Sequence, residues 1–260
     1  MNKIEIKILN PEVIKESEKM MVCSARLTQK GHTIKNLDDF IDLYNKAYTD
    51  KTVKAMVNLP HPTIQKFGTI NIVVVGASRR FLAQITRHQN DIKFMSASLQ
   101  YSDYSGEADF TVPYELFEDG NGMAKHAYLN SCKKAMDDYM SMTNFGIDND
   151  TAGYAAPQGL RNILIMSATP YQWKHMISQR VCRRNTQETR YVMLKIWEQL
   201  YKEDPVFFSN CGPFCMKDKC LEGKMCCQHF MNPDWTPSDI LEIDFPLIYT
   251  RDEKEVHKDV

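Results

Sequence analysis

The chain has 260 residues, 43% hydrophobic and 25% charged, which are the proportions of an ordinary globular protein. Its formal net charge of -1 creates no general attraction to a nucleic-acid polymer or an anionic membrane, so any anion site must be a local cluster of Arg and His. The longest apolar stretch, Ile70–Ala77, is too short to cross a bilayer, and the N-terminus carries charges where a signal peptide needs an apolar run. We therefore expect a cytoplasmic protein.

Hydrophobic periodicity predicts the elements of the first part of the chain. In chain order these are a strand over Lys3–Leu9, a helix from Pro11 to about Ala25, helices over Leu37–Tyr48 and Thr52–Val57, a strand over Ile70–Val75 and a helix over Ser78–His88. Proline at the first position of a helix costs no hydrogen bond, because that N–H has no partner in the helix.

The same kind of pattern predicts the elements of the second part of the chain. These are an extended segment over Gly106–Pro113, an amphipathic helix over Met123–Met142, an exit turn over Asn144–Asp150, a long helix from Pro170 to about Tyr201 and a docked extended tail over Asp239–Thr250. The apolar segment Leu160–Ala168 is compatible with either a strand or a helix. There is no internal repeat and no long linker, so we expect one α+β domain over 1–260 with an irregular segment at 205–236.

The irregular segment is rich in cysteine. In a cytoplasmic protein, the eight cysteines of this chain are expected to be thiols or metal ligands, not disulfides. Several are grouped near the C-terminus: Cys211, Cys215, Cys220, Cys226 and Cys227, followed by His229. They are numerous enough for a structural zinc, yet they lack the paired CxxC spacing of zinc knuckles. A loop of reduced, half-buried thiols is the alternative, and the sequence leaves both open.

The most informative stretch follows the strand at 70–75. It reads Gly76-x-Ser78-Arg79-x4-Gln84-x2-Arg87-His88-Gln89 and then Ser98-x-Gln100-Tyr101. Cations, amides and a hydroxyl beside an apolar strand predict a pocket for an anionic, hydrogen-bonding ligand. The neighbouring Arg79 and Arg80 are interpreted as a solvated pair outside the site.

Two further motifs extend this pattern along the chain. They are Trp173-x-His175-x4-Arg180-x7-Glu188-x-Arg190 and Gly212-Pro213-x-Cys215-x4-Cys220-x-Glu222-Gly223-x3-Cys227. With the N-terminal Asn10-Pro11 and the Pro60-His61-Pro62-Thr63 turn, these segments, in this order, resemble the flavin-dependent thymidylate synthase family over most of the chain. The resemblance implies a single α+β domain in which a central mixed or antiparallel sheet is packed by long helices.

The resemblance also implies an activity. It is the methylation of dUMP to dTMP with FAD as cofactor, methylene-tetrahydrofolate and NADPH as co-substrates, and a homotetramer with shared active sites. The flavin delivers hydride, so no nucleophilic side chain is required. The protein must bind phosphates, stack rings and stabilise negative charge on the pyrimidine, and the planar, always charged guanidinium of arginine suits these tasks.

The family's functional residues correspond to particular positions here. Arg180 corresponds to the arginine that polarises the pyrimidine and is the predicted catalytic residue. The resemblance and the cations near it predict a cofactor site of His61, Thr63, Arg87, His88, Gln89, His175 and Arg184. They predict a substrate site of Gln84, Arg87, Ser96, Ser98, Gln100, Arg161 and Arg180.

The chain departs from the family at four of these motif positions. Gln89, Gln100 and Gly153 stand where the family has arginine, and Ser96 stands where it has glutamate. The gap between Gln89 and Ser98 is also one residue longer than usual. A hydrogen bond to a charged group contributes about 1.5–3 kcal/mol, so the loss of two such bonds around one phosphate would weaken binding by orders of magnitude.

Three hypotheses follow from these departures. Arg161 and Arg184 could rebuild the anion site. The substrate could be another pyrimidine nucleotide such as dCMP, with a methyl or hydroxymethyl group transferred, because amide side chains can serve as donors or acceptors. The chain could also be a catalytically silent homologue that binds a nucleotide or flavin.

Overall fold

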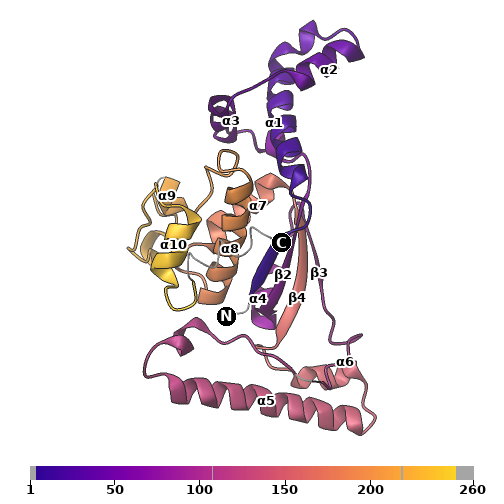
Figure 1. Cartoon of the computed structure of the whole chain (residues 1–260), viewed down its shortest axis with the longest axis vertical. Coiled ribbons are helices and arrows are strands. Elements are labelled where there is room, and N and C mark those ends of the chain that lie inside the picture. The colour runs from indigo at the N-terminus through magenta and orange to yellow at the C-terminus, as the bar shows by residue number, and fades with distance from the viewer. Residues whose placement is uncertain (1–3, 107, 218, 250–260) are drawn as a thin grey trace, which may run out of the picture.

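The computed structural model describes residues 4–106, 108–217 and 219–249, so Lys3 and Thr250 of the predicted terminal segments and Glu107 lie outside the described residues. Its centre is an antiparallel sheet of four strands in the order β1-β2-β4-β3 (Figure 1). The strands are β1 (Glu5–Ile8), β2 (Ile70–Ser78), β3 (Ile92–Ser96) and β4 (Arg161–Ala168). The predicted α+β class is confirmed, and the ambiguous segment 160–168 is a strand.

Helices cover one face of the sheet and lie beyond both ends of its strands (Figure 1). They are α1 (Glu12–Lys30), α2 (Leu37–Asn45), α3 (Asp50–Val57), α4 (Arg79–Ile85), α5 (Gly122–Asn144), α6 (Asn149–Ala152), α7 (Pro170–Arg180), α8 (Gln187–Glu203), α9 (Phe214–Lys217) and α10 (Pro237–Asp244). In Figure 1, α1 to α3 extend beyond one end of the strands, α5 crosses the other end, and α7, α8 and α10 lie to one side. Among the described residues, no helix is long and apolar enough to cross a membrane.

The predicted long helix from Pro170 to Tyr201 is wrong, because the chain breaks it between α7 and α8. The side-chain amide of Asn185 donates to the Gln179 carbonyl at 2.7 Å and satisfies one of the free acceptors at the end of α7. Arg183 turns away to form an ion pair with Asp244 at 2.7 Å. These polar contacts take the place of the main-chain hydrogen bonds that one continuous helix would form here.

The predicted extended tail over Asp239–Thr250 is also wrong over its described part, which begins as a helix, α10. Thr236 and Asp239 form a capping box, and Pro237 occupies the first turn. This is a strong local helix-start signal that the strand-like pattern of the tail concealed. Helix α1 also runs beyond the predicted end at Ala25, to Lys30.

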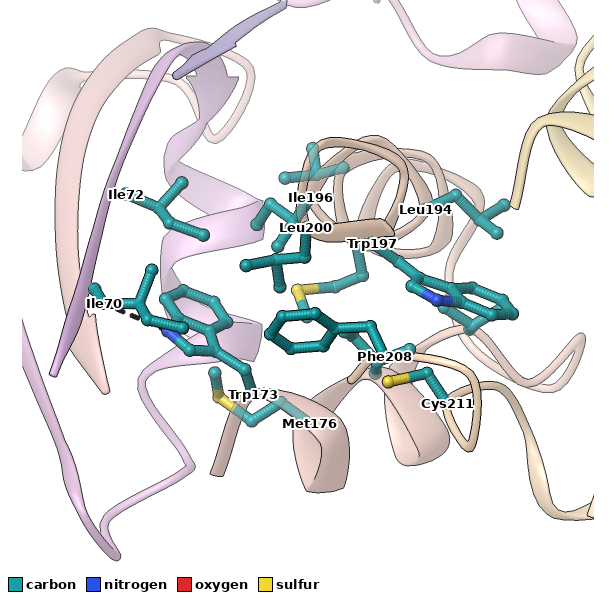
Figure 2. Close-up of a cluster of buried hydrophobic side chains, with 14 of the residues drawn as sticks. Ile70, Ile72, Trp173, Met176, Leu194, Ile196, Trp197, Leu200, Phe208 and Cys211 are labelled. Atoms are coloured by element: carbon teal, nitrogen blue, oxygen red, sulfur yellow. Dashed lines mark hydrogen bonds between the residues drawn. The ribbon is translucent and has the colours of Figure 1, made fainter. Parts of the chain in front are cut away.

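The core lies between the sheet and the pair α7 and α8, as Figure 2 shows. The side chains labelled there are Ile70 and Ile72 from β2, Trp173 and Met176 from α7, Leu194, Ile196, Trp197 and Leu200 from α8, and Phe208 and Cys211. The indole Nε1 of Trp173 donates to the Ile70 carbonyl at 3.1 Å, so even this core residue has its polar atom satisfied. Full burial of each large apolar side chain contributes about 1.5–3 kcal/mol.

The start of α4 is held by a bulge and a buried carboxylate. The β2–β4 register shifts between Val75 and Ala77, and Gly76 adopts a φ of 90° that other residues rarely accept. The Ser78 hydroxyl then accepts from the Phe81 N–H at 3.1 Å and donates to Glu188 of α8 at 2.6 Å. The motif at 76–89 is thereby attached to α8.

Candidate active site

The centre of the candidate site is a hydrogen bond between two motifs that lie far apart in sequence. Arg180, the last residue of α7, donates through Nε to Nε2 of His88 at 2.8 Å. His88 is buried just beyond α4. Burial, Arg180 and His175 together lower the pKa of His88 to about 4, so its imidazole is neutral near pH 7 and can accept this bond.

Arg180 has no carboxylate partner among the described residues. Its Nη1 is 3.4 Å from Oδ1 of Asn185, which is a neutral amide. Burial, followed by the charge of Arg87, lowers the pKa of Arg180, although an arginine remains protonated. A half-buried cation beside a second cation and without a counter-ion is suited to bind an anion.

An aromatic surface adjoins this pair. His175 lies edge-on to His88, with ring centroids 6.2 Å apart, and is stacked with Tyr171 at 6.5 Å and an interplanar angle of 16°. The ammonium of Lys66 lies 5.5 Å from the Tyr171 ring centroid and forms an ion pair with Asp91 at 2.6 Å. Stacked rings with cations nearby can hold a planar, anionic ligand.

The predicted residues His61 and Thr63 are exposed on the turn that contains the 3₁₀ helix η2 (Pro62–Gln65). This turn is attached to α7, because the buried Lys174 donates to Oε1 of Gln65 at 2.7 Å. The structure therefore places the turn against the helix that carries His175 and Arg180. It gives neither His61 nor Thr63 a side-chain partner among the described residues.

The predicted substrate residues on α4 and after β3 are more scattered. Ser96 lines an open cavity of about 490 Å³ with Arg79, Thr86 and Gln158. The Ser98 hydroxyl accepts from the backbone N–H groups of Gln100 and Tyr101 at 3.0 and 3.3 Å and shapes a turn.

Three other predicted residues point outward from this region. Gln84 is half-buried on α4, while Gln89 and Gln100 are exposed. Within the described residues, none of the three has a side-chain hydrogen bond that would commit it to the fold, so they remain candidates for ligand contact.

Arg161 and Arg184 belong to different elements of the fold. Arg161 begins β4 and forms an ion pair with Asp109 at 2.6 Å. Arg184 lies in the connection between α7 and α8, beside Arg180. The jointly rebuilt anion site stays a prediction, with Arg184 and Arg180 lining one cavity.

The C-terminal cysteines form a second feature of the site. A cavity of about 270 Å³, here called the thiol cavity, is lined by Cys182, Cys215, Cys220, Cys226 and Cys227 and also by Arg180, Arg184, Glu222 and His229. Within the described ranges, no three His, Cys, Asp or Glu side chains are grouped closely enough to hold a metal ion. All eight cysteines are free thiols in this structure.

Sequence reasoning missed several residues that shape the site. Asn185 contacts Arg180, Tyr171 stacks with His175, and Lys66 lies near the Tyr171 ring, yet none of the three was a predicted site residue. Arg79, interpreted from sequence as solvated, is only partly exposed and has a buried Nη1 without a hydrogen-bond partner in the described structure. The sequence signal for this partial burial was the position of Arg79 directly after a buried strand.

Comparison with known proteins adds independent findings. A family model described as thymidylate synthase complementing protein matches residues 12–206. The flavin-dependent thymidylate synthase of Thermococcus kodakarensis is 26% identical over 173 residues, which cover 64% of this chain and 69% of the relative. That of Pyrococcus furiosus is 24% identical over 179 residues, covering 65% and 70%.

Two solved structures share the fold at low identity. One is the UMP/dUMP methylase PolB from Streptomyces cacaoi bound with 5-Br dUMP, with a TM-score of 0.63, 14% identity, and coverage of 80% of this chain and 94% of that chain. The other is thymidylate synthase X from Helicobacter pylori with FAD and dUMP, with a TM-score of 0.59, 15% identity, and coverage of 80% and 98%. At such identities the likeness establishes the fold.

Proposed function

The chain belongs to the thymidylate synthase complementing protein family, the flavin-dependent thymidylate synthases, and we propose that it methylates dUMP to dTMP with methylene-tetrahydrofolate and reduced nicotinamide. The observation that carries this proposal is the Arg180–His88 pair. A half-buried guanidinium, held by a neutral imidazole and without a carboxylate partner in the described structure, is placed to meet a ligand that bears negative charge.

The residues around this pair fit FAD, which presents phosphates and a planar ring. The stacked Tyr171 and His175 offer a ring surface, and Arg180, with no counter-ion among the described residues, offers charge. We propose that the cofactor is held by the residues predicted from sequence: His61, Thr63, Arg87, His88, Gln89, His175 and Arg184. When bound, the flavin supplies hydride chemistry, so the protein needs no nucleophile.

The proposed role of Arg180 follows from its geometry. Nε donates to His88, and of the two terminal nitrogens only Nη1 has a partner among the described residues, Oδ1 of Asn185 at 3.4 Å. A guanidinium in this state can donate to a pyrimidine carbonyl and stabilise negative charge as C5 becomes nucleophilic. Arg87 adds a second cation, and Gln84, Ser96, Ser98 and Gln100 are proposed to position the nucleotide.

A different pyrimidine nucleotide is the second candidate substrate. Ser96, Gln89 and Gln100 are neutral where the family has charged residues, and amides can accept or donate at the exocyclic position of the base. The fold also occurs in a protein described as a UMP/dUMP methylase. These observations support testing UMP and dCMP beside dUMP.

We also propose that the chain works as a homotetramer in the cytoplasm. The face of the sheet opposite α7 and α8 carries exposed apolar side chains: Met95 of β3 is 71% exposed, and Ile163 and Ile165 of β4 are 50% and 41% exposed. Uncovered apolar surface of this kind usually marks an interface, and a second copy of the sheet would supply matching apolar side chains.

One experiment tests the proposed activity. The purified chain is incubated with FAD, methylene-tetrahydrofolate and NADPH against dUMP, UMP and dCMP in parallel, and the products are identified by mass. We expect a mass gain of one methyl group on dUMP, abolished in Arg180→Ala. Retained flavin and nucleotide binding without any product would instead establish the catalytically silent homologue.

A further inference from the structure

Two cysteines of the thiol cavity, Cys220 and Cys226, flank the short 3₁₀ helix η5 (Gly223–Met225), and both line the cavity that Arg180 and Arg184 also line. The backbone at Glu222 lowers the pKa of Cys220 and the neighbouring Cys226 thiol raises it, with a net rise. Both residues are partly exposed, so a small oxidant can reach them. This pair of cysteines lies in a segment, residues 220–226, that has no part in the proposed reaction.

The backbone after this pair supplies a hydrogen-bond donor to Cys226. The N–H of Gln228 points to Sγ of Cys226 at 3.3 Å, and Gln228 adopts a φ of 61°, which is uncommon for a residue other than glycine. A donor directed at Sγ suits Cys226 to act as the attacking sulfur. Cys227 is held differently, because its Sγ contacts the His229 carbonyl at 3.8 Å.

We propose that Cys220 and Cys226 are a redox modification site that a hydroperoxide converts reversibly into a disulfide. The Cys226 thiolate attacks one oxygen of the peroxide and the O–O bond breaks. Cys226 becomes a sulfenic acid, and the other oxygen departs as water. The Cys220 sulfur then attacks that sulfur, the S–S bond forms, the S–O bond breaks, and a second water leaves. Two thiols are oxidised and one hydrogen peroxide is reduced to two waters, while a dithiol reductant reverses the change.

The disulfide would alter the cavity wall beside Arg180. It closes a short loop that contains Glu222 and Gly223, and Glu222 lines the same cavity as Arg184. A constraint on this loop shifts the acidic Glu222 relative to Arg180 and Arg184, so ligand binding at these cations should become redox-dependent. This second step rests on the proposed function, whereas the modification itself does not.

The test uses the full chain, freshly reduced and then treated with stoichiometric hydrogen peroxide. Free thiols are alkylated, the protein is digested, and cross-linked peptides are mapped by mass, beside Cys220→Ser, Cys226→Ser and the matched neighbour Cys227→Ser. We expect a loss of two free thiols and a Cys220–Cys226 link in the wild type and in Cys227→Ser, reversed by dithiothreitol and absent from the other two variants. A link that maps to other cysteines, or peroxide treatment that leaves only unlinked sulfenic or sulfinic acids, overturns the proposal.

Two measurements keep the test decisive. If a serine variant fails to fold, the map of the oxidised wild type alone decides the pairing. Binding of dUMP is then measured before and after oxidation, with an expected several-fold loss in the wild type and none in Cys220→Ser. A disulfide without change in binding refutes the second step, while a reduced protein that binds no pyrimidine nucleotide refutes the proposed function and leaves the map valid.

Discussion

At the scale of single residues, the site depends on the state of one imidazole. His88 accepts from Arg180 only while it is neutral, because a protonated histidine has no acceptor nitrogen. The burial and cationic neighbours that lower its pKa to about 4 therefore also keep Arg180 oriented. The pair is a means of holding a guanidinium in place without neutralising its charge.

The stability of the protein should fall in mild acid because of His88. Its folded-state pKa of about 4 lies below the ordinary value of 6.5, so between these values the unfolded state binds the extra proton. The free energy of unfolding is then expected to decrease as the pH falls from 6.5 towards 4 and to be unaffected by His88 above that range. Urea unfolding from about pH 4 to about pH 7.5, a range that includes this window, measures the slope.

The matched variants identify the responsible histidine. His88→Gln retains an acceptor but does not titrate, so part of the slope should vanish, and the remainder is expected from His175, whose pKa burial also lowers. His32→Gln, at an exposed position, should leave the slope unchanged. An unaltered slope in His88→Gln would contradict a neutral His88 in the folded state.

Arg180→Lys should separate charge from geometry. Lysine retains the charge but cannot bond His88 and still present a forked donor, so we expect a loss of about 1.5–3 kcal/mol, or roughly 10- to 150-fold in nucleotide affinity. The measurement is calorimetric titration with dUMP. Arg80→Lys, an exposed arginine on α4, is the control, and equal affinities of both variants would exclude Arg180 from the nucleotide site.

At the scale of elements, buried carboxylates connect the segments that carry the motifs. Glu188 at the start of α8 accepts from the N–H and the hydroxyl of Ser78, at 2.7 and 2.6 Å. Asp244 at the end of α10 accepts from Arg183 and Arg190. Glu188 and Arg190 of the third sequence motif thus have structural partners, which distinguishes them from Arg180.

Removal of the Glu188 carboxylate should loosen α4 from α8. Glu188→Ala leaves two donors of Ser78 without their charged acceptor, and we expect a loss of about 1.5–3 kcal/mol in unfolding free energy. Urea denaturation measures this loss. Glu203→Ala, at the exposed end of the same helix, should change stability little. A similar loss in both variants would refute the proposed attachment of α4 to α8 through Glu188.

At the scale of the whole molecule, the sheet is covered on one face only. Helices α7 and α8 bury Leu164 and Met166 of β4, while the alternate residues Ile163 and Ile165 stay exposed. An antiparallel strand presents successive side chains to opposite faces, so an apolar residue on both faces of β4 indicates two buried faces. A single chain provides only one of them.

A charge on the uncovered face should therefore disrupt the proposed oligomer. Ile165→Asp is expected to shift the protein to a smaller species without unfolding it, as measured by light scattering after size-exclusion chromatography. Ile243→Asp, on α10 at a comparable exposure, is the control and should leave the mass unchanged. If the wild type is itself a monomer, the proposed tetramer is wrong.

Sequence reasoning predicted most helices and strands because their signals are local. Alternation marked the strands at 5–8 and 70–78, and periodicity marked α1, α2, α3 and α5. It missed β3, where Met95 interrupts the alternation that Ile92 and Lys93 begin, and it ran α7 into α8 across Asn185. At the break between α7 and α8, the ion pair of Arg183 with the distant Asp244 overrides the local pattern.

The sequence by itself determined the family and the fold class, because motifs in a given order and the periodicity of apolar residues are properties of the chain that need no coordinates. Only the tertiary structure decided which cations are available. Arg180, Arg183 and Arg184 look alike in sequence and all line the thiol cavity, yet Arg180 bonds His88, 92 residues away, Arg183 is neutralised by Asp244, and Arg184 is exposed. The physical reason is that a charge is free or paired according to what packing brings beside it, and packing joins residues that the sequence keeps apart.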